Sequence, residues 1–308
     1  MSITVVGTIG IDDIETPFGR VERTLGGSAA YFALAAANYE PVNLIAVVGE
    51  DLPAHSLDPL RGDRIDLTGI EQGQGPNFRW GGRYHMDFNT RDTLFTELGV
   101  LADFQPKMPG AYRDAAILFL ANLQPSVQMQ VIEQAPNARL VALDTMNFWI
   151  SSARDDLTRV LGMVDMVFMA EDELREFAGI ANLRAAAQRV MNMGPKFLVI
   201  KLGSYGALLL GRDGTYFAAP AFPLDEVRDP TGAGDSFAGG FLGSLAAALA
   251  NKRELGAVDY RRALLHGNIM GAFACEAFGV ERFASLTRTD LDARYNQLVS
   301  YTHIDGGA

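Results

Sequence analysis

Apolar residues gather in short runs that alternate with stretches of helical spacing along the first two thirds of the chain. The runs predict β-strands at residues 3–6, 43–48, 116–120, 140–143, 166–169 and 197–201. Amphipathic helices are expected between several of them, at residues 27–38, 126–134, 152–161 and 183–193. Nearly continuous apolar strands separated by helices are typical of a parallel sheet covered on both faces. The pattern therefore predicts one three-layer α/β/α domain over residues 1–308, with a mostly parallel central sheet.

The pattern changes after residue 206. Two apolar runs, at residues 207–210 and 215–219, flank a glycine-containing turn and predict a β-hairpin. Three further helices are expected at residues 235–250, 260–278 and 290–300.

Two segments do not follow the alternation of strands and helices. Residues 11–24 and 76–98 are polar and mixed with aromatic residues, and residues 84–88 alternate in hydrophobicity. Long insertions of this kind often form lids or binding loops, so we expect a small β-sheet lid inserted in the domain. Ordinary surface hairpins are the alternative. Unpaired strands at the edge of a lid would also offer a surface for a homodimer.

Composition narrows the class of protein. The 308 residues are 48% hydrophobic and carry a net charge of −11, with no long basic run, so nucleic acid is not an expected partner. Cys275 is the single cysteine, which excludes an intramolecular disulfide and fits a reducing compartment. The first residues resemble a strand rather than a signal peptide, and the longest apolar run, residues 237–250, is shorter than the ~20 residues of a membrane span. We therefore expect a cytoplasmic protein without a membrane segment.

The most informative segment is DPTGAGDSFAGGF at residues 229–241. Pro230 and Gly232 break the preceding structure, and a helix of small residues follows. Unsatisfied amides in the first turn of such a helix, at Ala233, Gly234 and Asp235, predict a binding site for an anion. Asp235 is then placed to accept the proton of an attacking hydroxyl in phosphoryl transfer. The alternative is an acidic residue that merely interacts favourably with the helix dipole.

Other polar residues are weaker candidates. Asn147, in the sequence DTMN after a strand, either faces a ligand at the sheet edge or caps the next helix, and we favour the cap. In the lid, His85 could contact a substrate, whereas Arg79, Arg83 and Arg91 are expected on a solvated face. The chain contains no P-loop and no complete G-x-S-x-G motif.

Residues 229–241 resemble the C-terminal signature of the ribokinase-like carbohydrate kinase (PfkB) family. GGSAAYFALA at residues 26–35 is similar to the glycine-pair motif of that family, and VVGTIGID at 5–12, VGED at 48–51 and VIKLGSYG at 199–206 resemble further motifs in the same order. The resemblance covers nearly the whole chain. It implies a ribokinase-like fold and ATP-dependent phosphorylation of a primary hydroxyl on a small sugar or sugar-like substrate.

The resemblance also implies roles for individual residues. Asp235 is the expected catalytic base. The anion hole would consist of Gly232, Ala233 and Gly234. Substrate would be bound by Asp12, Gly26, Gly27, Tyr31 and Asn147. ATP would be bound by Lys201, Gly203, Gly206, Thr231 and Asn268. Mg²⁺ is expected with ATP, with Glu173 acting through water, and a monovalent cation such as K⁺ near Asp229.

Three positions depart from the family pattern, because Gly10, Tyr31 and Ala170 stand where asparagine is common. The first two lie on the substrate side and argue against a plain ribokinase. A nucleoside kinase is the first alternative, since Tyr31, Phe32 and Trp80 offer rings that stack on a base. A catalytically silent binding or regulatory relative is the second.

Overall fold

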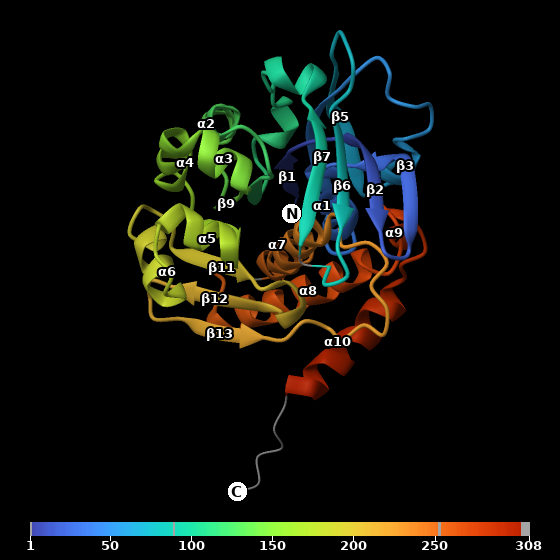
Figure 1. Ribbon diagram of the computed structural model, residues 1–308. Coiled ribbons are helices and arrows are strands. Elements are labelled where there is room, and N and C mark those ends of the chain that lie inside the picture. Colours follow the sequence, from blue (N-terminus) through green and yellow to red (C-terminus); the bar gives the residue numbers. More distant parts are fainter. Residues whose placement is uncertain (1, 89, 252–253, 303–308) are drawn as a thin grey trace, which may run out of the picture.

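The computed structural model describes residues 2–88, 90–251 and 254–302 and shows three layers (Figure 1). Within this part of the chain, nine strands form the central sheet in the order β13-β12-β11-β10-β9-β8-β1-β4-β5. The strands are β1 (Ile3–Val6), β4 (Val42–Val48), β5 (Ile65–Gln72), β8 (Ile117–Leu120), β9 (Leu140–Asp144), β10 (Met166–Ala170), β11 (Phe197–Lys201), β12 (Ala207–Gly211) and β13 (Tyr216–Ala219). The helices are α1 (Ser28–Ala36), α2 (Pro125–Gln134), α3 (Asn147–Ser152), α4 (Arg154–Leu161), α5 (Glu171–Ala178), α6 (Leu183–Met191), α7 (Ala233–Asn251), α8 (Ala257–Ala274), α9 (Glu281–Ala284) and α10 (Arg288–Thr302).

In the central sheet, neighbouring strands pair in parallel from β5 through β4, β1, β8, β9 and β10 to β11. The hairpin β12–β13 adds two antiparallel strands at one edge. The predicted α/β class with a mostly parallel sheet is therefore confirmed. The sequence pattern did not show β5, because its residues alternate between half-buried and exposed positions at the other edge of the sheet. It also missed α3, α5 and α9, of which α3 and α9 are too short for a clear period.

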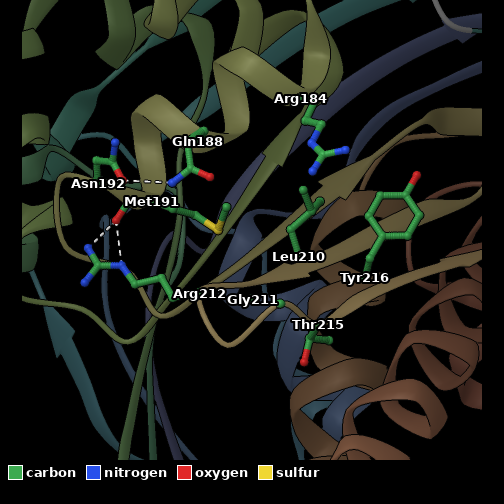
Figure 2. A pocket seen from close by; sticks show the side chains of 10 residues that line it. Arg184, Gln188, Met191, Asn192, Leu210, Gly211, Arg212, Thr215 and Tyr216 are labelled. Atoms are coloured by element: carbon green, nitrogen blue, oxygen red, sulfur yellow. Dashed lines mark hydrogen bonds between the residues drawn. The ribbon is translucent and has the colours of Figure 1, made fainter.

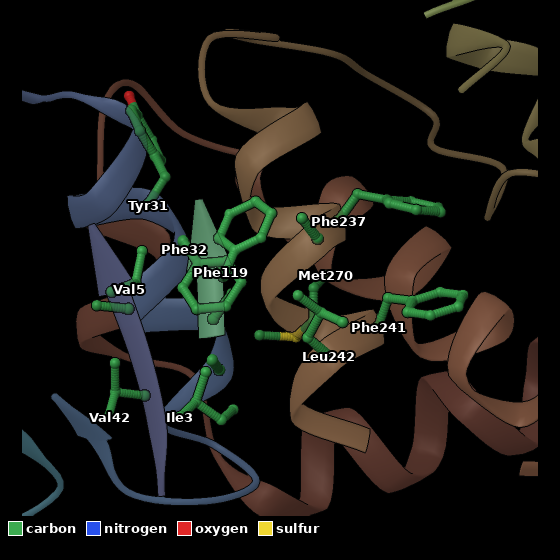
Figure 3. Packing of buried hydrophobic residues seen from close by; sticks show 14 of the residues in the cluster. Ile3, Val5, Tyr31, Phe32, Val42, Phe119, Phe237, Phe241, Leu242 and Met270 are labelled. Atoms are coloured by element: carbon green, nitrogen blue, oxygen red, sulfur yellow. The ribbon is translucent and has the colours of Figure 1, made fainter. Parts of the chain in front are cut away.

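Two hydrophobic cores lie on opposite faces of the sheet. Ile3 and Val5 of β1 point to one core and Val6 to the other, as the alternation of side chains along a strand requires. The first core is covered by α1, α7, α8 and α10 and is rich in aromatic rings, with Phe32 stacked on Phe119 at 4.3 Å between ring centres (Figure 3). The second core is covered by α2, α4, α5 and α6.

Helices α1 and α7 pack closely because Gly239 faces the contact. A Cβ atom on Gly239 of α7 would lie 2.6 Å from the carbonyl oxygen of Phe32 in α1, which no larger residue tolerates. This close packing fixes the start of α7 against the side chains of α1, including Tyr31.

A second, four-stranded sheet projects beside the main one in the order β3-β2-β6-β7 (Figure 1). Its strands are β2 (Gly10–Thr16), β3 (Gly19–Gly26), β6 (Arg79–Tyr84) and β7 (Arg91–Glu97). The two segments predicted to leave the main sheet thus supply these strands, with β2 and β6 parallel and the outer pairs antiparallel. The alternating run 84–88 contributes only Tyr84 to a strand, and the residues after it form a turn.

Polar side chains meet where the parallel strands end. Asp144 is the last residue of β9 and Lys201 the last of β11, so both stand at the carboxyl edge of the sheet. Short 3₁₀ helices occur in the connections between strands and helices, at Asp58–Leu60, Gly99–Asp103, Gly110–Tyr112 and Gly203–Tyr205. None of the helices in the described ranges combines the length and the apolar character that crossing a bilayer requires.

Candidate active site

The loop before α7 turns sharply at Gly232. This residue has φ = +72°, and a Cβ atom there would lie 2.3 Å from the ring of Tyr31, so both the backbone angle and the neighbouring ring require glycine. The Ala233 amide donates to the carbonyl of Pro230 at 3.2 Å, so this member of the predicted anion hole is already engaged. Among the described residues, the amides of Gly232 and Gly234 donate to no backbone carbonyl. The start of α7 therefore presents amide groups to an anion.

Asp235 lies in the first turn of α7 and is partly exposed to a cavity. Burial and the nearby charge of Asp144 raise its pKa to about 7, while Lys201 and Arg91 act in the opposite direction. A carboxylate with a pKa near neutrality can accept a proton and release it again at physiological pH.

Lys201 and Asp144 form a buried ion pair below the start of α7. The Nζ atom of Lys201 lies 2.9 and 2.8 Å from the two carboxylate oxygens of Asp144. A Cβ atom on Gly234 would lie only 3.3 Å from that Nζ atom, so the ammonium group adjoins the anion-binding loop. Glu173 lies near this pair, and burial raises its pKa to about 7. Its Oε2 accepts the amide of Ala170 at 2.7 Å, so Glu173 is buried rather than turned to solvent.

Asp12 of β2 and Tyr31 of α1 contribute polar atoms without a partner. Asp12 is 3% exposed, its Oδ1 atom has no hydrogen bond, and burial with nearby carboxylates raises its pKa to about 8. The hydroxyl of Tyr31 is also buried and unpaired, and it points away from the packed rings in Figure 3. A Cβ atom on Gly26 would lie 1.9 Å from Asp12, so Gly26 makes room for that carboxylate. Buried polar atoms without partners mark a place where a ligand supplies them.

Two cavities meet at the start of α7. The first, which we call the lid cavity, measures about 490 Å³ and lies between the small sheet and the strand ends. The second, the loop cavity, measures about 430 Å³ and lies between the loops 203–206 and 221–227 and helix α8. They share Lys201, Pro230 and Gly234. One molecule in each cavity would thus approach the other beside the anion-binding loop.

The structure brings most of the predicted site residues to these cavities. The lid cavity is lined by Asp12, Gly27, Tyr31, Asn147, Glu173, Lys201, Thr231, Gly232, Gly234 and Asp235. The loop cavity is lined by Lys201, Gly203, Gly206, Ala233, Gly234 and Asn268. Gly26 and Asp229 line neither cavity and lie behind the residues that do.

Several predicted positions differ from the structure. Thr231, expected beside ATP, lines the lid cavity, where its hydroxyl lies 3.3 Å from that of Tyr84. Asn147 is the first residue of α3 rather than its cap, and its side-chain amide donates to Glu176 at 2.6 Å. Phe32, expected to stack on a base, is fully buried in the core. His85 is paired with Asp92 at 3.0 Å and lines neither cavity.

The three lid arginines separate in the structure. Arg83 is half exposed and bound to Glu15 at 2.9 Å, as expected for a solvated face, whereas Arg79 pairs with Asp13 but is only 26% exposed. Arg91 differs, because it lines the lid cavity with its guanidinium 5.2 Å from the ring centre of Trp80. Of the three lid arginines, Arg91 is the one whose charge lowers the pKa of Asp235.

The residues of the lid cavity that sequence reasoning missed include Tyr84, Asn122, Phe148 and Trp149. Asp144 was noticed only as part of a strand-end motif. Its position at the end of β9, level with Lys201 at the end of β11, was the one signal that could have identified the ion pair.

A larger hollow of about 650 Å³ lies elsewhere, between α6 and the hairpin β12–β13 (Figure 2). Its lining includes Arg184 and Arg212 but no carboxylate, and the Arg212 side chain is bound to the carbonyl of Met191. This surface shares no residue with the lid or loop cavity.

Comparison with known proteins assigns a family to this site. A family model described as pfkB family carbohydrate kinase matches residues 3–285. The chain belongs to this family. The kinase resembles a cytidine kinase of Thermococcus kodakarensis, with 30% identity over 249 residues that cover 79% of this chain and 87% of the relative.

Two solved structures share its fold. A putative Ribokinase II from E. coli, in complex with ATP and Mg²⁺, superposes with a TM-score of 0.78 at 18% identity and covers 96% of this chain and 99% of its own. A nucleoside kinase of Burkholderia thailandensis, in complex with inosine, gives 0.75 at 19% identity and covers 97% and 98%. The ribokinase-like fold and the assignment as an ATP-dependent sugar or nucleoside kinase are confirmed by these relationships.

Proposed function

We propose that this kinase transfers the γ-phosphoryl group of ATP to a primary hydroxyl of a sugar or nucleoside, with Asp235 as the base. The observation that carries the proposal is the position of Asp235 where the lid cavity and the loop cavity meet. A hydroxyl in the first cavity and a triphosphate in the second would face each other across the anion-binding loop. The carboxylate of Asp235, with a pKa of about 7, stands in the first turn of α7 next to Gly234, which borders both cavities.

The step balances with these groups alone. The hydroxyl oxygen of the acceptor forms a bond to the γ-phosphorus, the bond from that phosphorus to the β,γ-bridging oxygen breaks, and ADP leaves. Asp235 accepts the hydroxyl proton. The amides at Gly232 and Gly234 and the ammonium of Lys201 stabilise negative charge on the moving phosphoryl group. Because Lys201 is held by Asp144, it stays charged and in place.

The acceptor would be held in the lid cavity by Asp12 and Tyr31. The unpaired Oδ1 of Asp12 accepts a hydrogen bond from a hydroxyl, and the unpaired hydroxyl of Tyr31 offers a donor beside it. Gly27 donates its amide to Asp12 and so orients the carboxylate. Asn147 borders the same cavity, although its amide is engaged by Glu176.

We assign ATP to the loop cavity. Gly203 and Gly206 leave space along one wall, and Phe222 with Ala272 provides an apolar slot of the kind a purine ring occupies. Asn268 is anchored by a hydrogen bond to the carbonyl of Ala219 at 3.3 Å. Mg²⁺ would arrive with the phosphates and supply positive charge between them. No cluster of three metal-ligating side chains occurs in the described part of the chain, and Glu173 would act through metal-bound water.

A monovalent cation such as K⁺ is proposed near Asp229. Its two carboxylate oxygens accept the amides of Thr231 at 2.8 Å and Gly279 at 2.9 Å, which ties the start of the anion-binding loop to residue 279. The carboxylate is fully buried, and its pKa is raised by burial. A bound cation would offset that buried charge.

The remaining features complete the proposal. The whole chain would act as one kinase unit, with the small sheet as its lid. The exposed edge strand β7 offers a surface for a homodimer, supported by Leu94, which is 50% exposed. The net charge of −11 supports a role without nucleic acid, and the need for ATP supports a cytoplasmic location.

The test of the base is the variant Asp235→Asn. We expect it to fold, to bind ATP in a thermal-shift assay, and to lose turnover by about 10²–10⁴-fold, the usual contribution of a positioned base. Asp172→Asn is a suitable control, because Asp172 is an exposed carboxylate in the first turn of α5. Wild-type turnover in Asp235→Asn, measured with the best of a panel of sugars and nucleosides, would remove the assignment.

A further inference from the structure

A third cavity, which we call the side pocket, adjoins the lid cavity. It measures about 290 Å³ and is walled mainly by apolar residues. Leu98, Leu101, Phe148 and Trp149 border both cavities. All four shared residues are apolar, so the boundary between the lid cavity and the side pocket carries no charged side chain among them.

Two aromatic rings form the border between the cavities. Phe148 and Trp149 lie 4.7 Å apart between ring centres at an interplanar angle of 78°. Phe148 is 47% exposed, which is unusual for a phenylalanine next to a large core. Exposed apolar side chains that are grouped at a concave site generally serve a ligand.

The orientation of Trp149 is fixed. Its Nε1 atom donates to Oδ1 of Asn122 at 2.8 Å, and the amide of Asn122 in turn donates to the sulfur of Met146. With the indole N–H satisfied, the ring offers only its apolar surface to the cavities. A ring that is held in this way loses little entropy when a flat ligand stacks on it.

The two ends of the combined space therefore differ in polarity. At one end, Asp12 and Tyr31 present unpaired hydrogen-bonding atoms. At the other end, beyond Trp149, the walls are mainly apolar and include the buried side chains of Phe104 and Val127. A free monosaccharide carries hydroxyls on every side, and some of these would face the apolar walls without a partner. A sugar joined to a flat aromatic ring matches both ends.

We propose that the acceptor is a nucleoside-like glycoside, whose sugar lies between Asp12 and Asp235 and whose aromatic ring extends past Trp149 toward the side pocket. This inference rests on the proposed function, because it places the sugar hydroxyl at Asp235. Gln124, an exposed residue at the pocket, has an amide that can bond to the polar edge of a heterocycle. The structure thereby assigns the base-stacking role to Phe148 and Trp149 rather than to Phe32.

The first test compares acceptors that share one hydroxymethyl group. Cytidine, adenosine and inosine are measured against methyl β-D-ribofuranoside, which has the same furanose ring but no aromatic group. We expect kcat/KM of the best nucleoside to exceed that of the methyl glycoside by about ten- to hundredfold, the usual contribution of stacking one base on an aromatic side chain.

The second test is direct binding. The chain has two tryptophans, Trp80 and Trp149, so the variant Trp80→Phe leaves Trp149 as the only indole. We expect the preferred nucleoside to change the emission of Trp149 at saturation, whereas the methyl glycoside leaves it almost unchanged. This measurement requires no turnover.

The third test closes the side pocket. Ala102 is an exposed residue of the 3₁₀ helix Gly99–Asp103 and lines the pocket, so Ala102→Phe fills space without disturbing the core. The matched control is Ala111→Phe, an exposed alanine in the 3₁₀ helix Gly110–Tyr112 that lines none of the three cavities. Ala102→Phe should reduce the ratio of nucleoside to methyl glycoside efficiency by about tenfold or more, and the control should not.

The outcomes separate the two proposals. If the methyl glycoside or a free sugar is phosphorylated as efficiently as any nucleoside, with no response from Trp149, the side-pocket inference is wrong and the kinase function stands. The inference is equally wrong if Ala102→Phe and Ala111→Phe behave alike. If nucleosides change the emission of Trp149 but no alcohol is phosphorylated, the side pocket is supported and the proposed reaction fails.

Discussion

The ammonium group of Lys201 lies within 2.9 Å of both carboxylate oxygens of Asp144. The two side chains are 17% and 4% exposed, so the pair is shielded from solvent. Burial opposes the charge on Lys201, but Asp144 and Glu173 outweigh it and raise the pKa of the ammonium group. Asp144 is also the nearby charge that raises the pKa of Asp235, after burial itself. One ion pair thus acts on both the phosphoryl site and the base.

Asp144→Asn should therefore shift the pH dependence of catalysis. Removing the negative charge removes one cause that raises the pKa of Asp235, so the base stays ionised at lower pH. We expect the acidic limb of the kcat/KM profile, near pH 7 in the wild type, to move to lower pH. The buried ammonium of Lys201 would also lose its partner, at a cost of about 3 kcal/mol in unfolding free energy.

Asp156→Asn serves as the control for Asp144→Asn. Asp156 forms a surface pair with Arg159 at 3.1 Å, so its loss should cost less than about 1 kcal/mol and leave the pH profile unchanged. Urea unfolding and pH–rate profiles of both variants check the prediction. An acidic limb that stays in place in Asp144→Asn would show that Asp144 does not influence the base.

Arg91→Gln should have the opposite effect on the base. Arg91 lowers the pKa of Asp235, so its removal should move the acidic limb to higher pH. The matched control is Arg83→Gln, because Arg83 lies in the same sheet but is bound to Glu15. Identical profiles for the two lid variants would place Arg91 outside the electrostatic environment of Asp235.

The sequence was most informative where structure depends on neighbours along the chain. Strand β11 was predicted at its full length because five apolar or half-buried residues follow one another, and the site loop was found because its glycines, proline and Asp235 are consecutive. Such patterns report local backbone geometry and need no knowledge of the tertiary fold.

The side pocket could not be predicted in that way. Its walls come from Leu98 in the connection after β7, Val127 of α2 and Trp149 of α3, and only the packed fold brings them together. The choice of Phe32 as a stacking residue failed for a related reason. Phe32 follows Tyr31 directly, but one step along a helix turns a side chain by about 100°, which directs Phe32 into the core instead.

Stability should decrease as the pH rises through neutrality. Asp12 and Asp235 have pKa values of about 8 and about 7 in the fold, against an ordinary value of 3.8. Above about pH 4 the unfolded chain therefore releases protons that the folded chain still holds, so the free energy of unfolding decreases as the pH rises. The decrease ends once both carboxyl groups ionise in the fold as well, at about pH 7 to 8. We expect Tm to fall between about pH 4 and about pH 8 and then to level off, whereas turnover rises as Asp235 ionises.

Asp12→Asn provides the check on that pH dependence. An amide cannot ionise, so the variant should lose part of the decrease in Tm and be more stable than the wild type at pH 9. Thermal unfolding of both proteins in buffers of equal ionic strength measures the difference. Parallel curves would mean that Asp12 does not keep its proton in the fold.

The last prediction concerns the contact between Tyr31 and Gly232. Gly232→Ala and Gly214→Ala both place a methyl group at positive φ, at +72° and +88°, so the backbone strain alone should cost each variant about 1–2 kcal/mol of stability. The methyl group at residue 214 meets no atom within 4 Å, whereas at residue 232 it overlaps the ring of Tyr31. Only Gly232→Ala should therefore displace the anion-binding loop and reduce kcat, by roughly a hundredfold.

The double variant Tyr31→Ala/Gly232→Ala distinguishes a steric cause from a backbone cause. Removing the ring opens the space that the new methyl group needs. The fold loss of kcat in the double variant should therefore be smaller than the product of the fold losses in the two single variants. Losses that multiply fully would mean that the positive φ angle alone displaces the loop. The resemblance to the family implies an asparagine at the position of Tyr31. This coupling therefore also shows whether the tyrosine supports the anion hole that it contacts.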